Sequence, residues 1–125
     1  MPLVNLFLQK RWEDKDGNIY AKRIGTLVIR MDKNTDWIND ASFTILYGDI
    51  TKRSDYEEYM GFQLGESARY SLNSKGKNVP IQEIGWGTED DEVTHMILEF
   101  CSSHGGSYIG SPGNTFWVDN IRLGY

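Results

Sequence analysis

Short segments in which apolar and polar residues alternate, each closed by turn residues, constrain this chain more than any other feature. Val4, Leu6 and Leu8 lie two residues apart, so in a strand they share one face. Residues 16–18, Asp-Gly-Asn, then provide turn chemistry, and residues 19–31 run back extended. The N-terminal part of the chain is therefore predicted to form a β-hairpin whose first strand has one face buried.

The same alternation recurs along the chain, and no stretch has the spacing of an amphipathic helix. Further strands are predicted over residues 42–49, 68–72, 79–86, 94–101 and 115–125. Residues 51–61 are predicted to form either one helical turn or a long loop. In the last strand the alternation slips at Asp119 and Asn120, as a β-bulge requires. About seven to eight strands without a covering helix predict an all-β fold, an antiparallel β-sandwich of two packed sheets.

Length and composition agree with a single domain over residues 1–125. Hydrophobic residues make up 39% of the chain and charged residues 25%, which is ordinary for a globular protein. Aromatic residues reach 13%, and so many aromatics together with 13 glycines favour strands over helices. The net charge of -5 argues against nucleic acid as the main partner.

Three further features are not predicted from the sequence. No apolar run approaches about 18 residues, so no membrane span is predicted. The first residues have neither the basic region nor the small-residue cleavage site of a signal peptide. Cys101 is the only cysteine in the sequence, which rules out an internal disulfide and a zinc site built from several thiolates.

The C-terminal third has a recognisable order of motifs. It reads MILEFCSSHGG over residues 96–106, SYIGSPGNT over 107–115 and FWVDNIRLGY over 116–125. This order resembles the closing segment of the carbohydrate metabolism domain family, in which a strand and a serine-rich turn lead to a final strand of the type aromatic-x-Val-Asp. Two earlier segments are also similar to that family: RIGT at 23–26, and Trp37 followed by FTILY at 43–47. The similarity covers residues 19–50 and 93–125.

The resemblance implies a jelly-roll β-sandwich, like that of carbohydrate-binding modules, on a secreted or cell-surface bacterial protein that handles glycans. It provides no catalytic motif. Family members carry a further N-terminal half that has no counterpart here. If such a half is missing, a second copy would cover the exposed sheet edges, so a dimer is an open expectation.

Aromatic residues beside carboxylates are the candidate carbohydrate-binding residues. The apolar face of a pyranose ring stacks on an aromatic ring, while its hydroxyls need amide or carboxylate partners. Trp86 lies between two glycines and is followed closely by Glu89 in a predicted loop. Asp55, Tyr56 and Tyr59 form a second such group. We predict that these five residues bind glycan, although packing in or around the core is the commoner role of a single aromatic residue.

Asp119, at the predicted bulge, has two interpretations. In jelly-roll binding modules the corresponding Asp ligates a structural Ca²⁺, a cation that takes six to eight oxygen ligands. A partner acid for such a site is not identifiable in the sequence. The favoured alternative is that the carboxylate accepts hydrogen bonds from backbone N–H groups freed by the bulge. No other cofactor is predicted.

Catalysis is the weaker hypothesis. A glycosidase needs two carboxylates that face each other across a cleft. The formally available carboxylates are those of Glu57, Glu58, Glu83, Glu99 and Asp119. An acidic chain always offers such candidates, and the sequence brings no two of them together. We therefore expect a non-catalytic glycan-binding module; a glycoside hydrolase and a structural or adhesion spacer stay open as alternatives.

Overall fold

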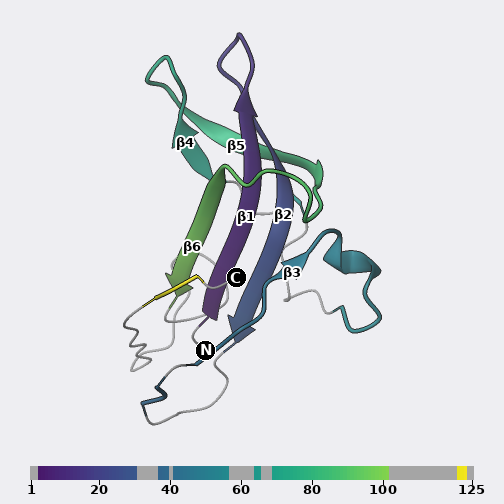
Figure 1. The fold of residues 1–125 in the computed structure, drawn as a ribbon. Coiled ribbons are helices and arrows are strands. Elements are labelled where there is room, and N and C mark those ends of the chain that lie inside the picture. Colours follow the sequence, from purple (N-terminus) through teal and green to yellow (C-terminus); the bar gives the residue numbers. More distant parts are fainter. Residues whose placement is uncertain are drawn as a thin grey trace.

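A computed structural model describes residues 3–30, 37–39, 41–56, 64–65, 69–101 and 121–123. The elements in this part of the chain are β1 (Leu3–Glu13), β2 (Ile19–Arg30), β3 (Leu46–Tyr47), the 3₁₀ helix η1 (Ile50–Lys52), β4 (Tyr70–Leu72), β5 (Asn78–Trp86) and β6 (His95–Cys101). The strands form a single sheet in the order β4-β5-β2-β1-β6, and β3 pairs with β2 (Figure 1). The prediction of a β-rich chain is confirmed. No helix among the described residues is long and apolar enough to cross a membrane.

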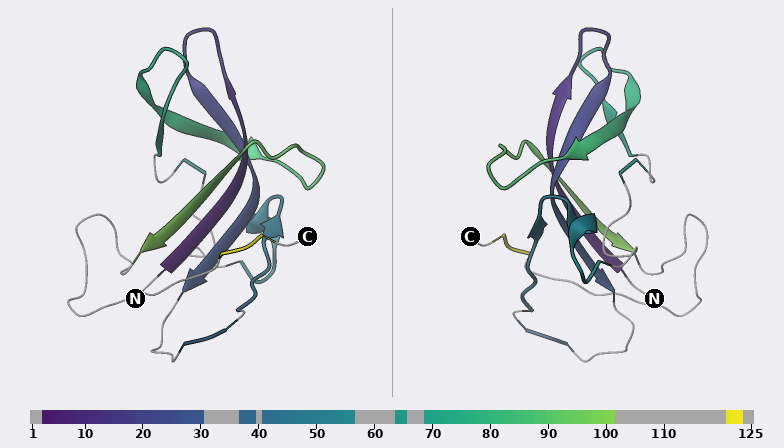
Figure 2. Two further views of the ribbon diagram at one scale, coloured as in Figure 1. Left: turned by 60° about the vertical axis from the view of Figure 1, so that its left-hand side comes forward. Right: turned by 90° about the vertical axis from the view of Figure 1, so that its right-hand side faces the viewer.

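The long β1–β2 hairpin is the centre of the sheet. Its strands pair from Leu3 opposite Arg30 to Glu13 opposite Ile19, and the register shifts after Leu8. β6 pairs with the first part of β1, whereas β5 pairs with the first part of β2. The sheet curls, so that β4 and β5 turn away from the plane of the other long strands (Figure 2). Residues 3–9 of β1 are consequently buried on both faces, and its last residues are exposed.

Apolar side chains gather in two clusters on opposite faces of the hairpin. The larger cluster contains Leu6, Leu8 and Ile24, against which Leu27, Ile45 and Leu98 pack. Gly25 allows this approach, because a Cβ there would lie 2.8 Å from Cγ2 of Ile45 and 3.1 Å from Cδ1 of Leu8. The second cluster joins β2 to β5 and contains Ile19, Ala21, Ile81 and Val79.

The prediction that all strands are antiparallel is wrong, because β5 runs parallel to β2. A strand alternates apolar and polar residues in the same way whichever direction its neighbour runs, so the pattern in the sequence does not fix the direction. The predicted sandwich of about seven to eight strands also differs from the described part of the chain, which forms one curled mixed sheet.

Most predicted elements have a counterpart, with changed bounds. The segment 42–49 contributes only the short β3, and the predicted helical turn after residue 50 is η1. β4, β5 and β6 lie within one residue of the predicted ends, except that β4 begins two residues later than expected. Of the predicted last strand, residues 121–123 are described and belong to no strand. The rest of that segment, with the proposed bulge at Asp119, lies outside the described residues.

Two hairpin turns with the same geometry meet at one end of the sheet. In the β1–β2 turn, Oδ1 of Asp14 accepts hydrogen bonds from the backbone N–H groups of Asp16 and Asn18. In the β4–β5 turn, Oδ1 of Asn73 accepts from the N–H groups two and four residues later, at 3.0 Å each. Each turn is completed by a glycine with positive φ, Gly17 at 87° and Gly76 at 75°. A short polar side chain at the first position and a glycine three residues on are the pattern of such turns.

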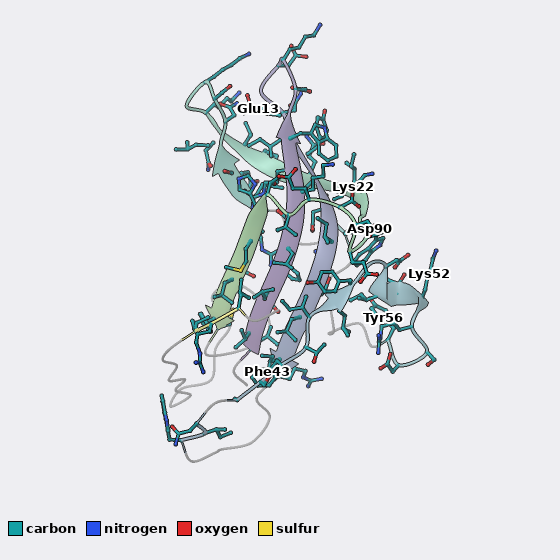
Figure 3. The ribbon with its side chains drawn as sticks, viewed as in Figure 1. Glu13, Lys22, Phe43, Lys52, Tyr56 and Asp90 are labelled. Carbon is teal, nitrogen blue, oxygen red and sulfur yellow. The ribbon has the colours of Figure 1, made fainter. Side chains whose placement is uncertain are left out.

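The two turns are bonded to each other. Nδ2 of the buried Asn73 donates to the carbonyl of Gly17 at 2.9 Å. The carboxylate of Glu13, which lies at the end of β1 (Figure 3), accepts from the N–H and the hydroxyl of Ser74. These contacts join the β1–β2 turn to the β4–β5 turn, next to the second apolar cluster with Ile19 and Ile81.

Replacement of Gly17 by Ala tests this junction. A Cβ at Gly17 would lie 2.6 Å from Nδ2 of Asn73, in addition to the cost of a left-handed conformation, which is about 1–2 kcal/mol for a residue other than glycine. Gly17→Ala should lower the free energy of unfolding by about 2–4 kcal/mol in urea denaturation. Gly76→Ala is the matched control, because its φ is similar but nothing lies within 4 Å of the added Cβ. Equal losses for the two variants would show that the turns do not depend on each other.

Candidate functional site

The loops that carry the predicted glycan-binding residues start from neighbouring positions on β2. The N–H of Gly48 donates to the carbonyl of Ile24 at 2.9 Å, and the N–H of Gly87 donates to the carbonyl of Arg23 at 2.8 Å. The loop with Asp55 and Tyr56 follows the first of these bonds, and the loop with Glu89 follows the second. Both loops therefore start along the same edge of the β1–β2 hairpin, the edge of β2 that pairs with β3 and β5, as the positions of Tyr56 and Asp90 show (Figure 3).

The predicted residues in these loops are partly engaged within the protein. Trp86 is half-buried, and Cζ of Arg23 lies 5.5 Å from the centroid of its ring. Tyr56 is half-buried, with a buried hydroxyl. Asp55 is exposed and forms an ion pair with Arg53, Nε to Oδ1 at 2.8 Å. Glu89 is exposed, whereas Tyr59 and Asp119 lie outside the described residues.

A second aromatic group, which the sequence analysis did not select, lies near the end of the β1–β2 hairpin. Trp12 and Tyr20 are direct cross-strand partners, with ring centroids 6.1 Å apart and ring planes tilted by 31°. Trp12 is 39% exposed. The register of the turn was the missing signal, since a hairpin that turns at residues 14–18 places residues 12 and 20 opposite each other.

Polar groups surround this aromatic pair. The hydroxyl of Tyr20 donates to Oδ2 of Asp14 at 3.3 Å, and Nδ2 of Asn18 donates to the same oxygen at 3.0 Å. The hydrogen bond from Asn18 is the main reason that the pKa of Asp14 is lowered, so this carboxylate is charged at neutral pH. Desolvation, followed by the charge of Asp14, raises the pKa of Tyr20. On the other side Gln82, exposed on β5, pairs with Tyr20.

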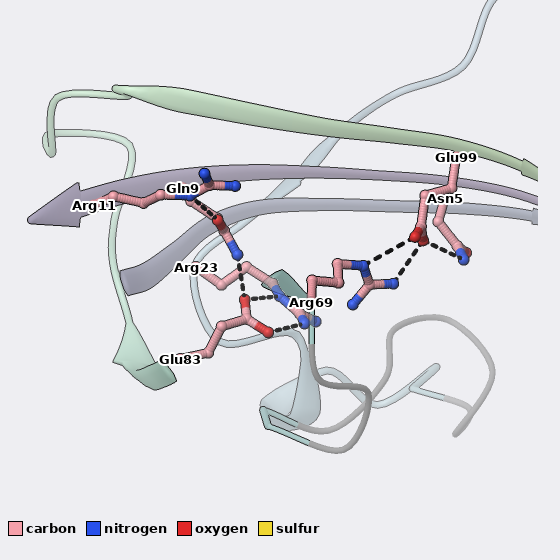
Figure 4. A network of polar contacts seen from close by, with 7 residues as sticks. All are labelled: Asn5, Gln9, Arg11, Arg23, Arg69, Glu83 and Glu99. Atoms are coloured by element: carbon pink, nitrogen blue, oxygen red, sulfur yellow. Dashed lines mark hydrogen bonds and ion pairs between the residues drawn. The ribbon is translucent and has the colours of Figure 1, made fainter. Parts of the chain in front are cut away.

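The opposite face of the sheet holds two buried or half-buried ion pairs (Figure 4). Glu83 accepts from Nη2 of Arg23 at 2.6 Å and from its Nε at 2.9 Å; the side chains are 7% and 1% exposed, respectively. Nε2 of Gln9 adds a third bond to Glu83 at 3.0 Å. Arg69 and Glu99 form a second bidentate pair, with Nη2 to Oε1 at 2.6 Å.

Phe7 joins the two ion pairs. Its fully buried ring lies between the guanidinium groups, with Cζ of Arg23 at 4.1 Å and Cζ of Arg69 at 4.9 Å from its centroid. Cations over an aromatic face are attracted by the ring quadrupole, and more so when they are desolvated. The arrangement therefore stabilises two charges that would be costly to bury alone.

The two carboxylates of this face were formal candidates for catalysis. A hydrogen bond from Arg69 lowers the pKa of Glu99, the opposite of the raised pKa that a general acid needs near neutral pH. Glu83 is held in place by three donors from Arg23 and Gln9. Among the described residues, no three His, Cys, Asp or Glu side chains are grouped so that they could hold a metal ion. Both ion pairs therefore fit a structural role.

Comparisons with protein-family models, with curated proteins and with solved structures find no match for this chain.

Replacement of Glu83 tests the buried pair. Glu83→Gln leaves the Arg23 guanidinium buried without its counter-charge, so we expect the free energy of unfolding to fall by about 3–5 kcal/mol. Asp55→Asn is the control, because it breaks an ion pair whose side chains are 44% and 59% exposed; it should cost much less stability than Glu83→Gln. Urea denaturation of both variants measures the difference, and a small loss for Glu83→Gln would contradict the structural role.

The second pair predicts a dependence on pH. Because the pKa of Glu99 is lowered in the folded state, its stabilising effect is present above the ordinary Glu pKa and is lost as the pH falls through the lowered value. Glu99→Gln should therefore be less stable than the unmodified protein at neutral pH, and the difference should shrink below about pH 4. Thermal unfolding over a pH series measures this. Glu89→Gln, on an exposed loop, should change little at any pH, and a Glu99→Gln difference that persists in acid would refute the explanation.

Proposed function

We propose that this protein is a non-catalytic carbohydrate-binding domain, which binds glycan by aromatic stacking and by hydrogen bonds to the sugar hydroxyls. The observation that carries the proposal is the pair of the exposed Trp12 and the half-buried Tyr20, with the charged Asp14 beside it. The family resemblance in the C-terminal third, with its jelly-roll sandwich and its secreted or cell-surface setting, belongs to the same proposal. The curled sheet would then be one layer of such a sandwich.

The chemistry of the pair suits a pyranose ring. The C–H groups of one face of the sugar pack on the exposed indole and phenol rings, which are apolar and rigid. Asp14 accepts four hydrogen bonds within the protein, one of them from Tyr20, and therefore orients the phenol ring, while the exposed Gln82 amide donates to and accepts from sugar hydroxyls. The contacts of Asn73 and Glu13 between the two turns, together with the bond from Nζ of Lys75 to the carbonyl of Lys15, hold these side chains in position before a ligand arrives, which reduces the entropy lost on binding.

The carboxylates support binding over hydrolysis. Glu83 and Glu99 are each held by an arginine on the face opposite Trp12. A hydrolase would need one protonated and one ionised carboxylate beside the bound sugar. The loops of Tyr56 and Trp86 are a second proposed contact region, where both aromatic rings are half-buried.

Trp12→Ala tests the proposal. It should weaken retention on a bound polysaccharide by about tenfold, the equivalent of 1.4 kcal/mol, because the largest stacking surface is removed. Trp37→Ala is the control, since Trp37 is 59% exposed and its indole N–H bonds to the nearby Asn39. Affinity electrophoresis through gels that contain different polysaccharides measures retention.

The same samples separate the alternatives. Retention that Trp12→Ala and Trp37→Ala reduce equally would place the site elsewhere, and Trp86→Ala would then examine the loop region. New reducing ends would transfer the assignment to a glycoside hydrolase. An absence of retention across neutral and acidic polysaccharides would leave the structural or adhesion spacer. Retention that is lost in the presence of a chelator would assign a bound Ca²⁺ ion, for which Asp119 is the candidate ligand from the sequence.

A further inference from the structure

Two lysines face each other beside the aromatic pair. Lys10 and Lys22 are direct cross-strand partners, and Trp12 and Tyr20 are the next partners on the same face of the hairpin. Directly opposed side chains in an antiparallel pair have Cβ atoms about 4.5–5.5 Å apart, and like charges in this position are destabilising. The hairpin thus carries two like charges at directly opposed positions, where an uncharged pair would cause no repulsion.

No carboxylate compensates the two charges within the part of the chain that the structure describes. Its ion pairs are Arg23–Glu83, Arg53–Asp55 and Arg69–Glu99, and none includes Lys10 or Lys22. Glu83 and Glu99 belong to the opposite face, since they pair with Ala21 and Asn5 in the register.

The acidic loop that follows β5 lies on the Lys22 side of the sheet. Asp91 in this loop is engaged with the N–H of Thr88 at 2.8 Å, and no ion pair links the loop to Lys22. The two ammonium groups are therefore available to an anionic ligand.

We propose that the glycan bound at Trp12 and Tyr20 is acidic, with a uronic acid residue whose ring stacks on the aromatic pair and whose carboxylate lies between Lys10 and Lys22. The inference rests on the proposed glycan-binding function and specifies its ligand class. Residues two apart in a strand are about 7 Å apart, and a lysine side chain spans enough of that distance to reach the rim of a stacked sugar ring. A bound carboxylate would turn the repulsion between the lysines into two attractions.

The negative net charge of the chain makes the positive charges of Lys10 and Lys22 important for an acidic ligand. At -5 the protein as a whole repels a polyanion, so only a short-range cationic contact favours an acidic polymer over a neutral one. At physiological ionic strength the screening length is about 8 Å, which is close to the distance between the two lysines and the stacked ring. The preference for acid should therefore be specific to this face.

The test compares polygalacturonate with its carboxyl-reduced form, which has the same sugar backbone without the charge. The unmodified protein should bind polygalacturonate at least tenfold more tightly in isothermal titration calorimetry. The double variant Lys10→Gln/Lys22→Gln should lose that preference, while its affinity for the reduced polymer stays unchanged. Lys77→Gln, on the separate β4–β5 hairpin, is the control that removes one lysine charge away from the aromatic pair, and it should bind both polymers as the unmodified protein does.

The outcomes distinguish this inference from the proposed function. Equal binding of both polymers by the unmodified protein, or an unchanged preference in the double variant, would overturn the acidic ligand and leave glycan binding intact. If neither polymer nor any neutral glycan binds, the proposed function itself fails. Tighter binding of a sulfated polymer with a different backbone would overturn the assignment to a carboxylated sugar.

The folded state provides an independent readout. Because the variant removes a like-charge contact, its urea midpoint should be equal to or higher than that of the unmodified protein. Lost binding with a retained midpoint would then come from the missing charges alone. A lower midpoint would show that the lysines stabilise the hairpin, and would overturn the argument from repulsion.

Discussion

The rest of the described fold depends on the burial of Arg23. Its guanidinium is bonded to Glu83 on β5, lies over the ring of Phe7 on β1 and is close to Trp86. Its backbone carbonyl also accepts the N–H of Gly87. One residue of β2 thereby connects three strands and the start of a loop. The buried cation must keep Glu83 beside it, because separation of this carboxylate leaves an uncompensated charge in a poorly solvated position.

The buried ion pair of Arg23 and Glu83 explains why β1 is buried in its first part and exposed at its end. Near Arg23 the β1–β2 hairpin is buried on both faces, with apolar packing on one face and paired charges on the other. Beyond it the second apolar cluster, with Ile19 and Ala21, continues on the face of the ion pairs, whereas Trp12 and Tyr20 lie on the other face. The contacts of Glu13 and Asn73 bond the two turns directly. Apolar burial and polar contacts together therefore hold the end of the hairpin that carries the aromatic pair.

The aromatic pair of the candidate site lies on the face of the sheet opposite the ion pairs. Its residues can therefore change without breaking the ion pairs. Glu83 and Glu99 stabilise the sheet through bidentate ion pairs with Arg23 and Arg69. Lys10 and Lys22 lie on the exposed side, where a repulsive pair costs stability but offers charge to a ligand.

The sequence by itself determined the local features: the central hairpin, the turn at Gly17, the second turn at Gly76 and most strand positions, because alternation and turn chemistry act between near neighbours. It also predicted Trp86 and the group of Asp55, Tyr56 and Tyr59 as glycan contacts, which stays a prediction, and the structure adds the Trp12–Tyr20 pair as a further candidate. Only the tertiary structure decided that β5 runs parallel to β2 and that Arg23 is buried. An arginine in an alternating strand is expected at the surface, and its burial depends on Glu83, which is 60 residues away in the chain. Register likewise decided that Lys10 faces Lys22, since cross-strand neighbours are set by pairing over the whole hairpin and not by spacing along one strand.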